Sequence, residues 1–369
     1  MFENYKKITK QEWAEKATKD LKGDDVFDKY QWDQGGLTID PYYDRTDLEG
    51  INFTPYVNRL LTHDDPSAEP RAWKNIESIQ ITDLKSANAE ALKALFMGAD
   101  GVEFNFNGCL DEVSAEVLLN DIMADYCFLS FSNITYADAL KLMHFLKLNF
   151  KPESLHGAIH LSEDENEHLA ELVLHVESLP HFRFSEAVCE QNITYPEQVA
   201  NLLEQANRHV RSLILHGIDN GTAVNMVSLT TCVGTDFFGE IAKIKALRQQ
   251  YFQLARAYGA TDFQPEHLMI KCKSPAWNKE AYAPHANMLK ASTAAMAAII
   301  GGCNILVVMP EKNDDSMQRR IARNVSTILK EESYLSKTND PAAGAYYIES
   351  LTDQIAKKGW ELFQNQLDR

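Results

Sequence analysis

The distribution of apolar residues divides the chain near residue 70 into two parts with different patterns. Beyond this point, short apolar runs alternate with longer segments in which apolar residues recur every three or four positions. The runs are typical of strands buried in a parallel sheet, and the longer segments are typical of amphipathic helices that cover it. The predicted strands are residues 76–80, 102–106, 127–131, 158–161, 182–185, 227–232, 268–273 and 305–309. The predicted helices are residues 84–98, 113–124, 135–147, 165–178, 196–215, 236–258, 285–300, 315–333 and 351–367.

Eight strands that are each followed by a helix indicate an α/β fold with a parallel sheet. Eight such units favour closure into a (β/α)8 TIM barrel over an open, doubly wound sheet. The length of 369 residues would allow two average domains, but barrels of more than about 250 residues are common as one unit. We therefore assign residues 71–369 to one barrel domain.

Residues 1–70 form an N-terminal arm with a different character. Residues 10–23 predict a helix, and an extended, aromatic stretch follows it. Such a segment has too little periodicity to fold alone, and buried aromatic side chains dominate interface energetics. Composition leaves open whether the arm packs on its own barrel or on another subunit. We expect another subunit, and we expect the barrel to fold without residues 1–40. The interface candidates are Trp13, Trp32, Tyr42, Tyr43 and Phe53.

The net charge of −17 argues against nucleic acid or an anionic membrane as a partner, because both require clustered cations. No apolar run is long enough to span a bilayer, and the charged N-terminus does not resemble a signal peptide. We therefore expect a soluble, cytoplasmic protein. The cysteines lie far apart without metal-ligand spacing, so reduced thiols are expected rather than a metal site. They are Cys109, Cys127, Cys189, Cys232, Cys272 and Cys303.

One run near the C-terminus joins a helix, a turn and a second helix in an unusual order. It reads RRIARN from residue 319, EES from 331 and DPAAGAYYIESLT from 340. Ser316 is a good cap for the first helix, Asp340-Pro341 stops it, and Ser350 with Asp353 resembles a capping box for the last helix. This run resembles RIARNTQ, EES and DPAGGSYYVESLT of the methylmalonyl-CoA mutase family. Residues 236–248 and 287–298 similarly resemble that family's NFFMEVAKLRAAR and VNMLRTTIAAFAA segments.

The resemblance covers nearly the whole chain and implies an acyl-CoA-binding barrel. Members of this family interconvert methylmalonyl-CoA and succinyl-CoA with adenosylcobalamin, and their corrin-binding domain carries a D-x-H-x-x-G motif. These 369 residues do not contain that motif. The resemblance therefore implies no cobalamin-binding domain and no cofactor-binding residue in this chain.

The resemblance also implies that the substrate pocket is degenerate. In active members the R-x-W-x-x-R-Q-Y string supplies an arginine and a tyrosine, whereas the matching run from residue 71 lacks both. Losing the guanidinium removes a bidentate partner for a substrate carboxylate. The histidine of the family's Y-H-M-Q-E-A-G-A-T string is replaced by alanine, which cannot donate a hydrogen bond. We therefore expect no catalytic residue here. The degenerate positions are Ile76, Ser78, Glu186, Ala187, Met226, Lys271 and Lys273.

Charged residues alternate on two of the predicted strands. Lys271 and Lys273 share one strand face, and Glu103 shares another with Asn105. Such charges either fill the lumen of a barrel as ion pairs or line a ligand cavity. We favour ion pairs, with a retained anion site as the alternative.

The resemblance thus implies a small (beta), catalytically silent subunit of a heterodimeric methylmalonyl-CoA mutase. Its partner would be the large (alpha) subunit, which would carry adenosylcobalamin, and the isolated chain could form a homodimer. The alternative is a self-sufficient acyl-CoA mutase that works with a separate corrin protein, or a barrel repurposed for another anionic ligand.

Overall fold

The computed structural model describes residues 8–51, 70–106, 113–176, 179–188, 193–274, 286–312 and 315–367. Its main feature is a nine-stranded parallel sheet in the order β7-β6-β5-β4-β3-β11-β10-β9-β8. The strand of this sheet that comes last in the chain, β11, pairs with the one that comes first, β3, since Ile305 lies opposite Lys74. The strands are β3 (Lys74–Gln80), β4 (Gly101–Asn105), β5 (Phe128–Ile134), β6 (His156–Leu161), β7 (Phe182–Arg183), β8 (Ser185–Val188), β9 (Val227–Cys232), β10 (Ile270–Lys273) and β11 (Ile305–Val307).

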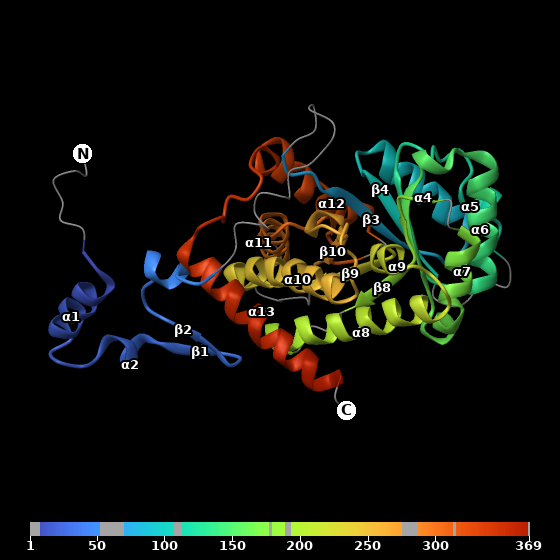
Figure 1. Cartoon of the computed structure of the whole chain (residues 1–369). Coiled ribbons are helices and arrows are strands. Elements are labelled where there is room, and N and C mark those ends of the chain that lie inside the picture. Colours follow the sequence, from blue (N-terminus) through green and yellow to red (C-terminus); the bar gives the residue numbers. More distant parts are fainter. Residues whose placement is uncertain are drawn as a thin grey trace.

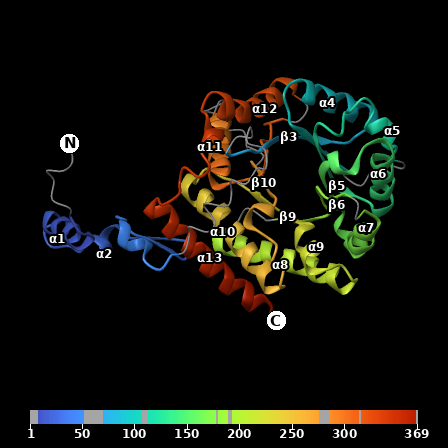
Figure 2. The same cartoon turned by 45° about the horizontal axis from the view of Figure 1, so that its top comes forward.

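The two ends of this sheet are consecutive in the chain. Only Phe184 separates β7 from β8; β7 pairs with β6, and β8 pairs with β9. The amide of Phe184 donates to the carbonyl of Met226, so the chain crosses from one neighbour to the other at this residue. The predicted fifth strand is thus divided in two, and the sheet is nearly closed. The predicted (β/α)8 class is confirmed (Figure 2).

Helices cover the outer surface of the ring (Figures 1 and 2). Alanine-rich helices with small buried residues, such as Ala294 and Ala298, pack closely on the sheet. Polar residues cap the N-termini of α4, α6, α8, α10 and α12; Asp236, for example, accepts a hydrogen bond from the amide of Gly239. The main helices are α4 (Leu84–Phe96), α6 (Tyr136–Asn149), α7 (Leu169–Val176), α8 (Tyr195–Leu215), α10 (Phe237–Ala257), α11 (Ala286–Gly301), α12 (Ser316–Glu331) and α13 (Tyr346–Leu367).

Three predicted helix features differ from the structure. The helix predicted at 113–124 is only α5 (Ala115–Leu118), because the Asn88 amide donates to the carbonyls of Leu118, at its end, and Asn120, just beyond it. Asp315, rather than Ser316, caps α12. The last helix, α13, begins at Tyr346 instead of 351, because the Glu349 carboxylate accepts a hydrogen bond from the Gly344 amide. A short helix, α9 (Asn220–Asn225), was not predicted.

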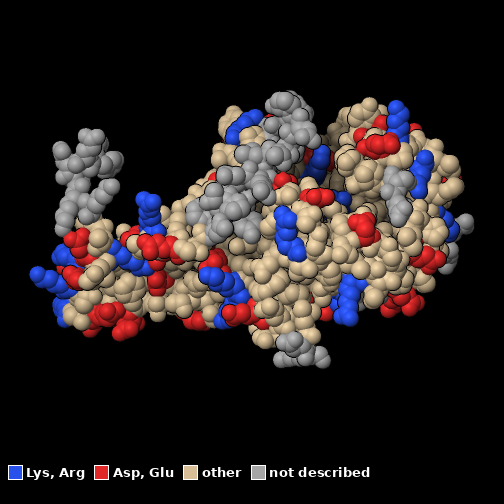
Figure 3. Space-filling model, in the orientation of Figure 1, with Lys and Arg blue, Asp and Glu red and all other residues tan. Residues whose placement is uncertain are grey.

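The arm is more structured than its sequence suggested. It contains α1 (Lys10–Asp20), α2 (Val26–Tyr30), a hairpin of β1 (Trp32–Gln34) and β2 (Leu37–Ile39), and a 3-10 turn, η1 (Arg45–Leu48). The prediction of an extended segment is therefore wrong for residues 26–30. In Figure 1, α1 and α2 project away from the barrel, whereas the hairpin lies against α13. In Figure 3 the arm surface carries both acidic and basic side chains.

The hairpin and the outer arm, which consists of α1 and α2, make different contacts. In the hairpin, the Thr38 amide donates to Gln354 Oε1 over 3.1 Å, and Leu37 and Ile39 are buried in the main core. In the outer arm, Trp13 stacks on Tyr42 with ring centroids 4.5 Å apart. The arm is therefore anchored on its own barrel by the hairpin, while α1 packs on other residues of the arm.

The interface candidates fall into three groups. Trp13 and Tyr42 pack on each other, and Tyr43 lies 5.1 Å from the ring of Tyr347 at the start of α13. Trp32 is 52% exposed, which leaves it available for a partner. Phe53 lies outside the described residues. In the part of the chain that the structure describes, no helix is both long and apolar enough to cross a membrane.

Candidate site in the barrel lumen

Strand alternation points every second side chain into the barrel, and these side chains form two layers. One layer is an apolar cluster separate from the main core, which fills the space between sheet and helices. The other layer is charged and lies nearer the C-terminal ends of β4, β8 and β10. The apolar layer consists of Ile76, Phe128, Ala158, Ile305 and Val307.

The charged layer is a continuous network of ion pairs. Lys271 Nζ lies 2.7 Å from Glu103 Oε1 and 2.5 Å from Glu186 Oε1, so one ammonium group bridges two carboxylates. Lys273 Nζ lies 2.9 Å from Glu103 Oε2. Two lysines thus balance two glutamates, as a buried cluster of charges requires. The predicted pairing of Lys271 and Lys273 with Glu103 is confirmed.

Two further side chains, those of Thr230 and His160, contact the Glu186 carboxylate. The hydroxyl of Thr230 donates to Glu186 Oε1, and His160 Nδ1 lies 3.1 Å from Glu186 Oε2. On its other side, His160 Nε2 lies 3.4 Å from the Ser228 hydroxyl. Glu186 is therefore held from three strands, β6, β9 and β10.

Burial and pairing act in opposite directions on these groups. Burial would raise the pKa of the Glu103 carboxyl, but the charges of Lys271 and Lys273 outweigh it and hold that pKa well below its usual range. Burial would also raise the pKa of the Glu186 carboxyl, but His160 and Lys271 lower that pKa to about 2. Burial would lower the pKa of Lys271, but the two glutamates raise it above its ordinary value. Glu103, Glu186 and Lys271 therefore remain charged at neutral pH.

His160 behaves differently, and its burial predicts a pH dependence of stability. Burial lowers the pKa of His160 from 6.5 to about 4, so the folded chain keeps the ring neutral where the unfolded chain binds a proton. Stability is therefore lost as the pH falls from 6.5 toward 4. We expect a loss of about 2 kcal/mol from this residue at pH 5.

Urea unfolding at pH 7 and pH 5 measures this loss, and the variant His160→Gln should show a smaller one. Part of the dependence should survive in that variant, because burial also lowers the pKa of His209 to about 4. Equal losses in the two proteins would contradict the assignment to His160. The carboxylates act in a lower window: their lowered pKa values contribute stability above pH 4.5 that is lost only on further acidification.

The mouth of the lumen contains additional polar groups. Lys273 is 25% exposed there at its side chain, unlike Lys271. Asn133 has a positive φ of 57° at an irregularity of β5, and its amide donates to Asn105 Oδ1 over 2.8 Å. Ser130 and Ser132 are buried, and their hydroxyls have no hydrogen-bond partner among the described residues.

The structure brings together some of the sequence-predicted positions and separates others. Glu186, Lys271 and Lys273 join one network, and Ile76 faces the same lumen on β3, with Ser78 two residues further on. Ala187 and Met226 belong instead to the main core between sheet and helices. These two positions therefore do not line the lumen with the others.

Sequence reasoning did not assign His160, Ser228 or Thr230 to this network. Their only signal was a polar residue at alternate positions of a predicted strand, which does not identify a partner on another strand. Of the cysteines, Cys127, Cys232, Cys272 and Cys303 are free thiols, and Cys109 and Cys189 lie outside the described residues. Within the described ranges, no three His, Cys, Asp or Glu side chains are grouped as metal ligands.

The fold and the lumen define a (β/α)8 barrel with a charge-filled interior, and comparison with known proteins shows which family it is similar to. Residues 187–368 match the family model described as methylmalonyl-CoA mutase. The chain is 27% identical to the methylmalonyl-CoA mutase small subunit of Porphyromonas gingivalis, over 98% of this chain and 63% of the relative. It is 32% identical to methylmalonyl-CoA mutase of Escherichia coli, over 47% of this chain and 24% of the relative.

A third relative, the methylmalonyl-CoA mutase small subunit of Streptomyces virginiae, is 31% identical over 52% of this chain and 30% of its own length. The chain thus spans less than two thirds of the length of these relatives. The similarity of this chain is therefore to the methylmalonyl-CoA mutase family, as the motifs near its C-terminus predicted.

Proposed function

We propose that this chain is the small, catalytically silent subunit of a heterodimeric methylmalonyl-CoA mutase. The observation that carries the proposal is the ammonium group of Lys271, which bridges Glu103 and Glu186 inside the barrel. In an acyl-CoA-binding barrel, cationic side chains would have to be free to meet an anionic substrate. Here both lysines of the lumen are neutralised by carboxylates of the same chain, and this favours a structural role over catalysis.

The partner in this proposal is the large subunit, which would bind adenosylcobalamin and isomerise methylmalonyl-CoA to succinyl-CoA in the cytoplasm. Two relatives are named as small subunits, and that name implies a larger companion. The residues of this lumen do not fit a separate cofactor site, because its charged groups already bind one another. When adenosylcobalamin is bound to the large subunit, it would supply the radical for the rearrangement.

The arm supports the proposed assembly. Tyr30, at the end of the projecting helix α2 (Figure 1), and Trp32, at the start of the adjacent hairpin, are both more than half exposed. Large exposed aromatic side chains of this kind anchor protein interfaces. We therefore propose that the outer arm docks on the large subunit.

An activity assay on the pure chain tests the proposed silence. The chain is mixed with adenosylcobalamin and methylmalonyl-CoA, and succinyl-CoA formation and the cobalamin absorption spectrum are followed. We expect no turnover and no spectral change, and we expect both to appear when the purified large subunit is added. Turnover by the isolated chain would instead indicate a self-sufficient mutase. A homodimer without affinity for the large subunit would also contradict the proposal.

A further inference from the structure

A second site lies outside the barrel, on the opposite side of the sheet from the lumen. A groove of 330 Å³ separates α4 from α12, which are neighbours on the outer ring (Figure 2). This volume is at the lower end of the range of about 300–1,000 Å³ found for small-molecule sites. The groove is lined by Glu77, Glu90, Lys93, Ala94, Met97, Ser316, Met317, Arg319, Arg320 and Arg323.

The groove has an excess of positive charge in a chain whose net charge is −17. Of its ionisable side chains, four are cationic and two are carboxylates. Arg319 takes most of the available negative charge: its Nε and Nη2 lie 2.8 and 2.7 Å from Glu77 Oε1, and its Nη1 lies 2.5 Å from Glu90. Arg320 and Lys93 form no ion pair with any described residue.

Arg323 has an unused binding edge, although only 7% of the residue is exposed. Its Nη1 pairs with Glu77, its Nη2 donates to Met97 Sδ over 3.4 Å, and its buried Nε has no partner among the described residues. The Nε–Nη2 edge is the one with which Arg319 holds a carboxylate oxygen. A guanidinium edge matches a carboxylate bidentately, whereas a thioether sulfur is a weak acceptor.

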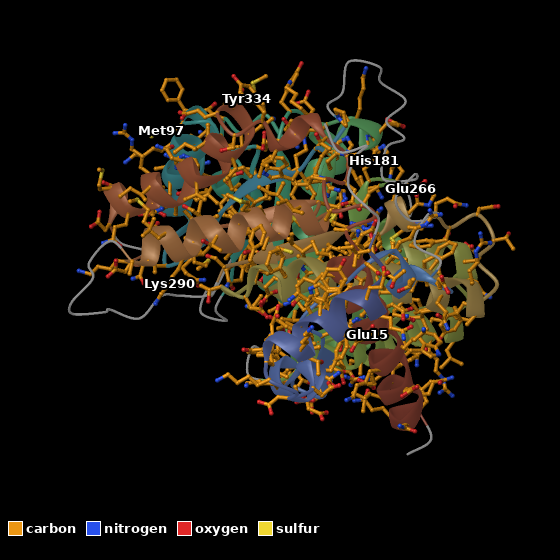
Figure 4. The ribbon with its side chains drawn as sticks, turned by 90° about the vertical axis from the view of Figure 1, so that its left-hand side faces the viewer. Glu15, Met97, His181, Glu266, Lys290 and Tyr334 are labelled. Atoms are coloured by element: carbon orange, nitrogen blue, oxygen red, sulfur yellow. The ribbon has the colours of Figure 1, made fainter. Side chains whose placement is uncertain are left out.

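Met97 is placed so that it can leave this edge without disturbing the fold. It is the C-cap residue of α4, lies at the outer edge of the molecule in Figure 4, and is 47% exposed. Its side chain is unbranched and adaptable. A stronger acceptor could therefore displace the sulfur by a change of side-chain rotamer alone.

We propose that the groove between α4 and α12 binds a carboxylate that carries a short apolar body. The carboxylate replaces the Met97 sulfur at the Nε–Nη2 edge of Arg323. The apolar body lies on Ala94 and the two methionines, while Arg320 and Lys93 attract the anion. This inference does not depend on the proposed subunit role, because it concerns only residues of this chain.

The test uses the full chain labelled with ¹³C at the methionine methyl groups. Hexanoate, 1-hexanol and hexylammonium share one apolar tail and differ only in the head group. Hexanoate should produce saturable shifts in the Met97 and Met317 signals, which the variants Met97→Leu and Met317→Leu assign. The alcohol and the amine should not produce them.

Variants separate recognition of the carboxylate from simple apolar contact. Removing the rim cations in Lys93→Ala/Arg320→Ala should weaken hexanoate binding about tenfold, which corresponds to about 1.4 kcal/mol. Met97→Leu should tighten it, because leucine keeps the apolar surface but no longer competes for Arg323; a purely structural role for Met97 predicts no tightening. Lys85→Ala is the control, since Lys85 is exposed on α4 outside the groove.

A blocked dipeptide, acetyl-Leu-Glu-amide, distinguishes two sources of the carboxylate. Stronger binding of the dipeptide would indicate an acidic side chain of a protein segment, and stronger binding of hexanoate would indicate a free acid. Equal shifts with hexanoate and hexanol would overturn the proposal. So would hexanoate binding that neither the double alanine variant nor Met97→Leu alters.

Discussion

Replacing Glu103 with glutamine is expected to destabilise the folded chain by about 3–5 kcal/mol, because it leaves two lysine ammonium groups in the lumen without their shared counter-ion. Glu103 is fully buried and contacts both Lys271 and Lys273. Glutamine has the same size, so the loss reports charge rather than packing. Urea unfolding at pH 7 measures the change.

Glu90→Gln is the matched control for this substitution. Glu90 pairs with Arg319, but the Glu90 side chain is 46% exposed, so solvent reaches this carboxylate. Such pairs contribute at most about 1 kcal/mol. A loss for Glu103→Gln no larger than that for Glu90→Gln would mean that the lumen is hydrated enough to screen its charges.

Deleting residues 1–30 is expected to leave the barrel folded while weakening assembly with the proposed large subunit at least tenfold, or about 1.4 kcal/mol. The deletion removes α1 and α2, which project from the barrel, and with them Trp13 and Tyr30. Circular dichroism checks the fold, and analytical ultracentrifugation with the large subunit measures assembly. An unchanged dissociation constant would exclude the outer arm from the interface.

A deletion of residues 1–40, which the sequence alone suggested would leave the barrel folded, is not suitable for this experiment. A deletion of 1–40 also removes Leu37 and Ile39, and burying one such side chain contributes about 1.5–3 kcal/mol. That deletion is expected to destabilise the barrel itself. Trp32→Ala provides a point test within the retained hairpin, and Tyr126→Ala, which is 79% exposed on the barrel, is its control.

The sequence predicted the barrel well because its strands are near-continuous apolar runs with little dependence on distant residues. The alternation of Lys271, Lys273 and Glu103 was equally local, and it correctly predicted ion pairs. The role of Glu186 was not predictable in this way. Its partners come from three other strands, and the register between strands is not encoded in the spacing along any one of them.

Two other differences have different causes, one non-local and one local. The division of the fifth strand at Phe184 follows from its hydrogen bond to the chain before β9, which no local turn residue announces. The hairpin in the arm did have a local signal that was overlooked. Gly35 and Gly36 both have positive φ, 61° and 83°, as the two central residues of a tight hairpin turn require.

The contact between the hairpin and α13 has a consequence for synthesis on the ribosome. Thr38 and Gln354 are 316 residues apart in sequence, so the hairpin cannot make this contact until almost the whole chain has been synthesised. At about 5–20 residues per second this interval is roughly 15–60 s. Throughout it, Leu37 and Ile39 have no core to enter. In nascent chains of this protein, the apolar side chains of the hairpin should therefore be exposed and able to bind chaperones, or a partner subunit made nearby, before the barrel is complete.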